Sequence, residues 1–155
     1  MRLFEHPSTR TLLPFLRNYL SASIPLHLAW ETAQLPLYTL WTTGKPREIT
    51  FAIIHCTVGD IMIAAFAIAA GLFLFGGKEW PRRHALRVAT ATVIFGISYT
   101  IFSEWLNVSV RESWAYSELM PIFPILGTGL SPVMQWLMIP PLALTLAHAR
   151  NRVQI

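Results

Sequence analysis

Four apolar stretches, each long enough to cross a lipid bilayer, dominate this sequence of 155 residues. They cover about residues 20–41, 50–75, 86–106 and 121–147. A helix needs about 20 apolar residues to cross the hydrocarbon core, and in lipid the backbone must satisfy its own hydrogen bonds. The sequence therefore predicts an all-α, integral membrane, four-helix transmembrane bundle. No linker or repeat divides the chain, so we expect a single domain over residues 1–155.

Charge supports the same class of protein. Only 13% of the residues are charged and 54% are hydrophobic, whereas soluble domains carry roughly 25% charged residues. The net charge of +4 could indicate nucleic acid, but the basic residues stand at the ends of the apolar stretches and form no basic stripe. We therefore expect no nucleic-acid partner. Cys56 is the only cysteine, which excludes an intrachain disulfide and a cysteine-based metal site.

The distribution of lysine and arginine predicts the orientation. One side of the predicted bundle, formed by the N-terminus, the second connection and the C-terminus, carries Arg2, Arg10, Arg17, Lys78, Arg82, Arg83, Arg87, Arg150 and Arg152. The other side carries Lys45, Arg47 and Arg111. Because basic residues are retained in the cytoplasm, both termini are expected to be cytoplasmic. The length and the absence of sorting motifs favour a bacterial inner membrane over the endoplasmic reticulum.

Ionisable residues interrupt the first two stretches. His27, Glu31 and Gln34 follow one another at i, i+4 and i+7, which places them on one face of a helix. The second stretch contains His55 and Asp60. Counting helix rise from the outer ends puts Glu31 and Asp60 at the same depth, about 15 Å below the outer boundary.

A carboxylate at that depth costs several kcal/mol unless it is protonated, paired or hydrated. Such residues are usually functional, and the five together predict a polar pocket inside the membrane. The alternative is structural, with His27 and Glu31 satisfying each other and locking the bundle.

Three further features surround the predicted pocket. Glu104 ends the third stretch, as a pocket residue or as an ordinary interface residue. The connection after it contains Trp114, Tyr116 and Glu118, and could close over the outer mouth or form an aromatic belt. Trp136, in the proline-rich fourth stretch, lies at about the depth of His27. It could present its ring to a cationic ligand, pack in the core or contact lipid.

Several chemistries are disfavoured. The sequence has no glycine-rich phosphate loop, no Ser-His-Asp arrangement, and no Glu-x-x-His pair of the kind that carboxylate diiron sites use. A haem between His27 and His55 is disfavoured because their depths differ by about 14 Å. We therefore expect no metal and no cofactor. Acid–base chemistry, or binding of an amphipathic cation, remains for a pocket that opens to lipid.

The order of these motifs resembles the EXPERA superfamily, the four-helix module of sterol Δ8-Δ7 isomerases and sigma-2-receptor-like proteins. The matching segments are "HLAWE" with His27 and Glu31, Asp60 on the second helix, "YTIFSEW" with Glu104, "SELMP", and "MQWLMIPP" with Trp136. The resemblance spans about residues 20–147. It departs from the superfamily at Asp60 (usually glutamate), Ile63 (a hydroxyl residue) and Val133 (asparagine). It implies that His27, Glu31 and Asp60 move protons while Trp136 faces a carbocation.

These observations lead to one hypothesis with two alternatives. We expect a membrane-embedded isomerase or binding protein for a sterol- or isoprenoid-like lipid. Its candidate catalytic residues are His27, Glu31, Asp60 and Glu104. Its candidate ligand-binding residues are Gln34, His55, Trp114, Tyr116, Glu118 and Trp136. The alternatives are a non-catalytic ligand-binding module and an accessory subunit of a larger membrane complex; a homodimer is also compatible with the sequence.

Overall fold

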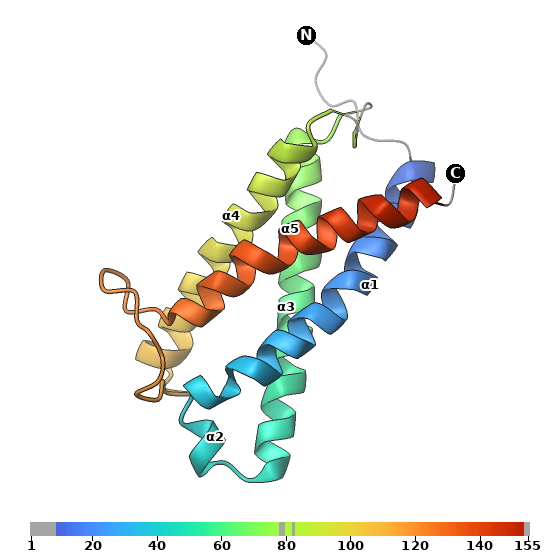
Figure 1. Ribbon diagram of the computed structural model, residues 1–155. Coiled ribbons are helices and arrows are strands. Elements are labelled where there is room, and N and C mark those ends of the chain that lie inside the picture. Colours follow the sequence, from blue (N-terminus) through green and yellow to red (C-terminus); the bar gives the residue numbers. More distant parts are fainter. Residues whose placement is uncertain (1–8, 78–79, 82, 154–155) are drawn as a thin grey trace.

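Four long helices pack into a bundle in the computed structural model, which describes residues 9–77, 80–81 and 83–153 (Figure 1). They are α1 (Thr9–Gln34), α3 (Pro46–Phe75), α4 (Ala85–Glu104) and α5 (Leu130–Val153), and a short α2 (Leu40–Thr43) follows α1. The all-α prediction is confirmed for the described residues. Arg2, Lys78 and Arg82 of the charge count lie outside them.

The helices define two ends of the bundle (Figure 1). The terminal end holds the start of α1, the connection between α3 and α4, and the end of α5. The loop end holds α2 and the 111–129 loop, which joins α4 to α5. This arrangement places both described chain ends on the same side of the bundle, as the predicted topology requires.

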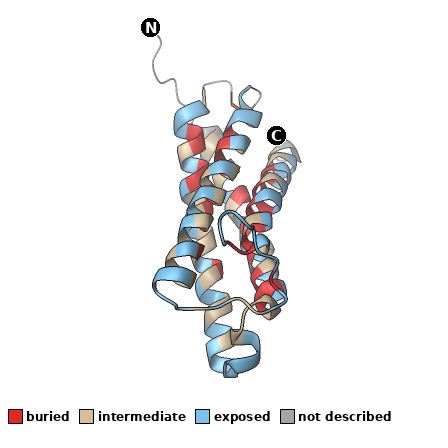
Figure 2. Ribbon diagram, turned by 90° about the vertical axis from the view of Figure 1, so that its left-hand side faces the viewer, coloured by how far each residue is buried: buried red, intermediate tan, exposed pale blue. Residues whose placement is uncertain are grey.

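Three of the helical segments are long and apolar enough to cross a membrane: Pro46–Phe75, Ala85–Val110 and Leu130–Asn151. Their outward faces are exposed, while buried residues lie where the helices face one another (Figure 2). The exposed side chains include Phe51, Met62, Phe66, Ile94, Leu137 and Leu142. A large apolar surface of this kind is stable only in contact with lipid or another protein. The structure thus indicates an integral membrane protein.

Helix α1 is as long as the others but more polar, and it is not among these three segments. Arg17, Ser21 and Thr32 are exposed, but most of its described polar side chains face inward. Five of them are buried in the bundle: Asn18, Ser23, His27, Glu31 and Gln34. Helix α1 contacts both α3 and α5, so the polarity that lowers its mean hydropathy is directed into the protein.

Several helix boundaries differ from those expected from the apolar stretches. The first stretch was expected to be helical over residues 20–41, but α1 begins at Thr9, ends at Gln34 and is followed by a 3₁₀ turn, Leu35–Leu37. Pro36 explains the end, because proline disfavours helical backbone in the residue before it. The second stretch begins earlier than expected, at Pro46, since proline is well tolerated in a first helical turn.

The fourth stretch, expected over residues 121–147, also differs. Helix α5 starts only at Leu130. Residues 121–129 instead form a turn, in which the amide of Phe123 donates to the carbonyl of Thr128 at 2.8 Å. Gly127 has a φ of 65° there, a left-handed conformation that glycine adopts without strain. The third helix extends beyond residue 106, because a π-helical turn (Trp105–Val110) continues α4.

The bundle is closed between α4 and α5 by a tryptophan lying on a glycine. Trp136 is completely buried. A Cβ atom at Gly96 would overlap the Trp136 indole ring, so only glycine lets the two helices approach this closely. At the terminal end Phe15, Trp80 and His148 pack together, with the Phe15 and Trp80 ring centroids 4.4 Å apart.

Substituting Gly96→Ala is expected to lower the free energy of unfolding by about 1–3 kcal/mol, the usual cost of overpacking. Thermal unfolding in detergent measures this effect. Gly59→Ala is the matched control, because among the described residues nothing lies within 4 Å of a Cβ atom at that position. It should keep or raise the unfolding temperature, since alanine is the better helix former. Equal unfolding temperatures for the two variants would contradict this packing.

Candidate functional site

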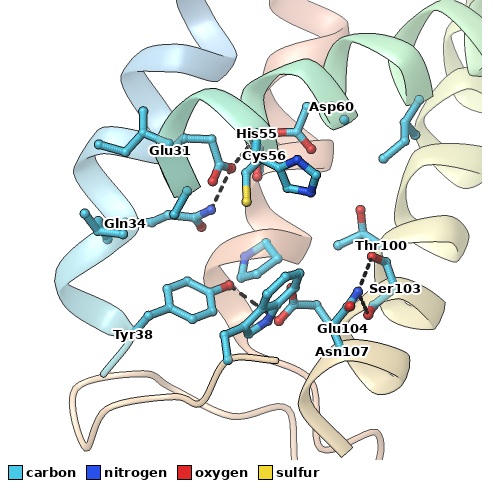
Figure 3. Close-up of a pocket in the computed structure, with 18 of the residues that line it drawn as sticks. Glu31, Gln34, Tyr38, His55, Cys56, Asp60, Thr100, Ser103, Glu104 and Asn107 are labelled. Atoms are coloured by element: carbon cyan, nitrogen blue, oxygen red, sulfur yellow. Dashed lines mark hydrogen bonds between the residues drawn. The ribbon is translucent and has the colours of Figure 1, made fainter. Parts of the chain in front are cut away.

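A cavity of about 440 Å³ lies in the loop-end half of the bundle, between α1, α3, α4 and α5. Its polar lining includes Glu31, Gln34, His55, Asp60, Glu104 and Gln135. In Figure 3, Glu31 and Glu104 project toward the cavity from opposite sides, with Cys56 between them. Three carboxyl groups therefore border one space, contributed by three different helices.

Gln135 of α5 connects two of these carboxyl groups to His27. Its side-chain Nε2 lies 2.8 Å from Asp60 Oδ2, 3.1 Å from Glu31 Oε1 and 2.9 Å from His27 Nδ1. Gln135 is itself buried, with 2% of its surface exposed. We call these four residues the Gln135 cluster. It joins α1, α3 and α5 at a single amide nitrogen.

The direction of these hydrogen bonds follows from their chemistry. An ionised carboxylate can only accept, so the amide nitrogen and not its oxygen faces these groups. His27 Nδ1 accepts from the same nitrogen in the tautomer that carries its proton on Nε2. The NH₂ group has two hydrogens for three acceptors. One acceptor must share a hydrogen or receive a proton from elsewhere.

His27 occupies the closed side of the cluster. It is completely buried, its Nδ1 is 3.4 Å from Asp60 Oδ2, and its ring centroid is 5.3 Å from that of Trp136. It is not among the residues that line the cavity. No hydrogen bond joins His27 directly to Glu31 among the described residues, so the structural alternative in which they satisfy each other does not match this geometry.

The predicted polar face of α1 exists. Gln34 Nε2 donates to Glu31 Oε1 at 2.7 Å, and Gln34 Oε1 accepts from Ser131 Oγ of α5 at 2.8 Å. His27, Glu31 and Gln34 are all buried. Their shared face is therefore directed at α5, and its hydrogen bonds are made within this chain.

Glu104 forms a second polar group on the α4 side. It is 7% exposed, and it accepts hydrogen bonds from the hydroxyl groups of Tyr116 and, at 3.4 Å, Tyr38. The Tyr116 oxygen also accepts from the backbone amide of Gly129 at 3.0 Å. Burial, and then the bond to Glu104, raise the pKa of Tyr116 above its usual value. The phenol therefore remains a hydrogen-bond donor at neutral pH.

The 111–129 loop is fixed to the segment that follows α1. Thr39 N donates to Ala115 O at 3.0 Å, and Ser117 N donates to Leu37 O at 2.9 Å. Trp114 of this loop lines the cavity. The loop thus crosses the loop end of the cavity, where the sequence had suggested a lid or an aromatic belt; a moving lid remains a prediction.

The remaining predicted residues fall in different places. Trp136 lines the cavity behind Gln135. His55 is exposed at the cavity rim and stacks on Phe51, with ring centroids 5.4 Å apart. Glu118 is exposed and is not a lining residue, because its position in the loop lies beyond the turn that carries Tyr116 inward.

Sequence reasoning missed Gln135, Tyr38 and Ser131. A sequence signal for Gln135 exists, because it is an amide residue within an apolar helix, as Gln34 is. Tyr38 was missed because it was expected inside the first span, over residues 20–41, whereas α1 ends at Gln34 and leaves Tyr38 in the segment that follows.

The described residues contain no group of three or more His, Cys, Asp or Glu side chains arranged to hold a metal ion. Comparison with known proteins found no matching family model, no matching curated protein and no matching solved structure. The site must therefore be interpreted from its own geometry.

Replacing Gln135→Leu is expected to destabilise the protein by about 1–3 kcal/mol, because two buried acceptors, on His27 and Glu31, and the part-buried Asp60 lose their donor. Thermal unfolding in detergent provides the measurement. Met134→Leu, on the exposed side of the same helix turn, is the control and should leave the unfolding temperature within error. A Gln135→Leu variant as stable as the parent would show that the amide contributes no net hydrogen bonding.

Removing one hydroxyl group should loosen the loop. Tyr116→Phe loses the bonds to Glu104 and Gly129 while keeping the ring, so we expect faster amide hydrogen exchange in residues 111–129 and little change in α3. Tyr99→Phe is the control, since Tyr99 is half exposed on α4. Unchanged exchange in the loop would mean that backbone hydrogen bonds alone hold it.

Proposed function

We propose that this protein binds a lipid-like small molecule of the sterol or isoprenoid class in the cavity and isomerises it by proton transfer. The observation that carries the proposal is the Gln135 cluster, in which two carboxyl groups share one amide donor at the edge of a cavity. Ordinary packing gives no reason to place two such groups together, because burying carboxylates in an apolar environment is costly.

The proposed membrane topology has four spans, with α1 as the fourth and both termini in the cytoplasm. Two observations support it. The polar residues of α1 are covered by α3 and α5, so the helix can cross lipid despite its composition. The basic residues predicted to be cytoplasmic gather at the terminal end, as Arg17, Arg83 and Arg150 illustrate. A bacterial inner membrane remains the favoured location.

The proposed chemistry divides the cluster by position. Glu31 and Asp60 face the cavity, and in the proposed reaction one carboxyl group carries the proton and acts as the acid while the other is the base. The acid protonates one carbon of the ligand double bond, and positive charge develops on the other carbon. The base then removes a proton from the adjacent allylic carbon, so the double bond shifts by one position and the proton lost by the acid is balanced by the one gained by the base. Gln135 and His27 are positioning residues, and Trp136 presents its ring to developing positive charge.

The alternatives differ in what they require. A non-catalytic binding module needs the same cavity but no proton transfer. An accessory subunit would need an unsatisfied polar face for a partner helix, whereas Gln135 and Ser131 already satisfy that face of α1 from within the chain. The subunit alternative is therefore disfavoured, and the binding module is separated from the isomerase by experiment.

The test uses lipids extracted from native membranes, incubated with the purified protein in deuterated water. Proton transfer would place deuterium on carbon in an unsaturated lipid, which mass spectrometry detects. Glu31→Gln and Asp60→Asn should each reduce incorporation by about 100-fold or more, the scale of general acid–base catalysis. The exposed Glu118→Gln is the control and should retain the parent rate.

Two outcomes would contradict parts of this proposal. If a lipid co-purifies and binds but acquires no deuterium, the protein is a binding module. If Glu31→Gln and Asp60→Asn both retain the parent rate of incorporation, the cluster is not the acid–base pair.

A further inference from the structure

Two glycines of α3 have opposite surroundings. A Cβ atom at Gly71 would lie 3.0 Å from the Val88 carbonyl oxygen and 3.2 Å from Thr92 Oγ1 of α4. At Gly59 such an atom would meet nothing within 4 Å among the described residues, although Gly59 lines the cavity. Helices α3 and α4 therefore touch closely in the terminal half and separate toward the loop end, as Figure 1 also shows.

Side chains on both sides of this gap line the cavity and are also exposed on the protein surface. Met62 of α3 is 68% exposed and Tyr99 of α4 is 51% exposed, and both line the cavity. His55, one helical turn from Gly59, is also exposed and also lines it. A residue can do both only where the cavity meets the surface, so the cavity opens between α3 and α4. Arg111, at the start of the 111–129 loop, is also exposed and lines the cavity, so the opening extends to the loop end.

At the loop end the 111–129 loop lies across the cavity. The loop is held there by Tyr116, by the backbone bond from Ser117 to Leu37 and by Ser117 Oγ, which donates to Pro36 O at 3.1 Å. Trp114 of the same loop lines the cavity. A ligand coming from water would meet this loop and the charged side chain of Arg111, whereas the side between α3 and α4 carries no such cover among the described residues.

We infer that the gap between α3 and α4 is a lateral opening through which an amphiphile dissolved in the bilayer reaches the cavity. Both helices qualify as membrane spans, and their surfaces beside the gap are apolar, with Val58 and Phe102 each more than half exposed. The opening thus faces hydrocarbon, which admits an apolar molecule and disfavours an ion. Gly59 lines this opening without a side chain.

The identity of the ligand rests on the proposed function, but the opening does not. Cys56, the only cysteine in the sequence, lines the cavity and is part-buried. The rate at which it reacts therefore reports access to the cavity without any ligand. The reagents are an alkyl maleimide that partitions into lipid, and a cationic and an anionic methanethiosulfonate that remain in water.

In liposomes, the alkyl maleimide should modify Cys56 faster than both charged reagents added on either side. Gly59→Phe should slow the alkyl maleimide about tenfold or more, because the added ring extends into the gap that the reagent must cross. Tyr99→Ala should accelerate it. Ala69→Phe, an equal enlargement at an exposed position of α3, is the control and should match the parent.

The labelling rate of each variant is normalised to the total reactivity of Cys56 after denaturation in dodecyl sulfate. Met62→Trp narrows the same gap and replaces Gly59→Phe if that variant does not fold. The inference is overturned if both narrowing variants react with the alkyl maleimide at the parent rate, or if the cationic reagent reacts fastest. The result is separate from the proposed function. A narrowed gap that slows labelling, together with no deuterium transfer in the parent, would retain the opening and reject the isomerase.

Discussion

The side-chain amide of Gln135 binds acceptors from α1 and α3 simultaneously, and much of the structure depends on that bridge. Two carboxyl groups and an imidazole in an apolar bundle would be strongly destabilising without a donor. The amide nitrogen lies within hydrogen-bond distance of all three and has two hydrogens to share among them. Because Gln135 precedes Trp136, the same turn of α5 also places the indole ring against α4 at Gly96. Polar satisfaction and helix packing are thus fixed by adjacent residues.

That arrangement also divides the polar residues into an inner and a cavity-facing set. His27 is enclosed behind Gln135 and against Trp136, whereas Glu31 and Asp60 border the cavity. A ligand in the cavity would therefore contact the carboxyl groups, and His27 would affect it only indirectly, through its interactions with them. This differs from the role that the resemblance to sterol isomerases assigns to His27, for which direct proton transfer is implied.

The loop between α4 and α5 contributes the opposite wall. Tyr116 reaches from the loop to Glu104 and accepts from Gly129, so the carboxyl group of α4 and the turn before α5 are held by one phenol. The result is a cavity that the loop crosses at one end and that borders the separation of α3 from α4 along its side. An apolar gap along the side is what a site for a membrane-dissolved molecule requires.

The sequence by itself determined that the chain is helical, that it belongs in a membrane, and that His27, Glu31 and Gln34 share one face, since apolar length and helical periodicity are local properties. It also placed Glu31 and Asp60 at one depth, because helix rise is constant. It misplaced the ends of the first and fourth stretches, where prolines and glycines override hydropathy.

Only the tertiary structure decided which residue unites the polar groups and where the cavity opens. Gln135 lies more than a hundred residues from Glu31 in the chain, and its role depends on how α5 is rotated against α1. The rotation is set by the fit of Trp136 to Gly96, and the opening by how far α3 and α4 diverge beyond Gly71. Both are properties of side chains packing between helices, which no single helix carries in its own sequence.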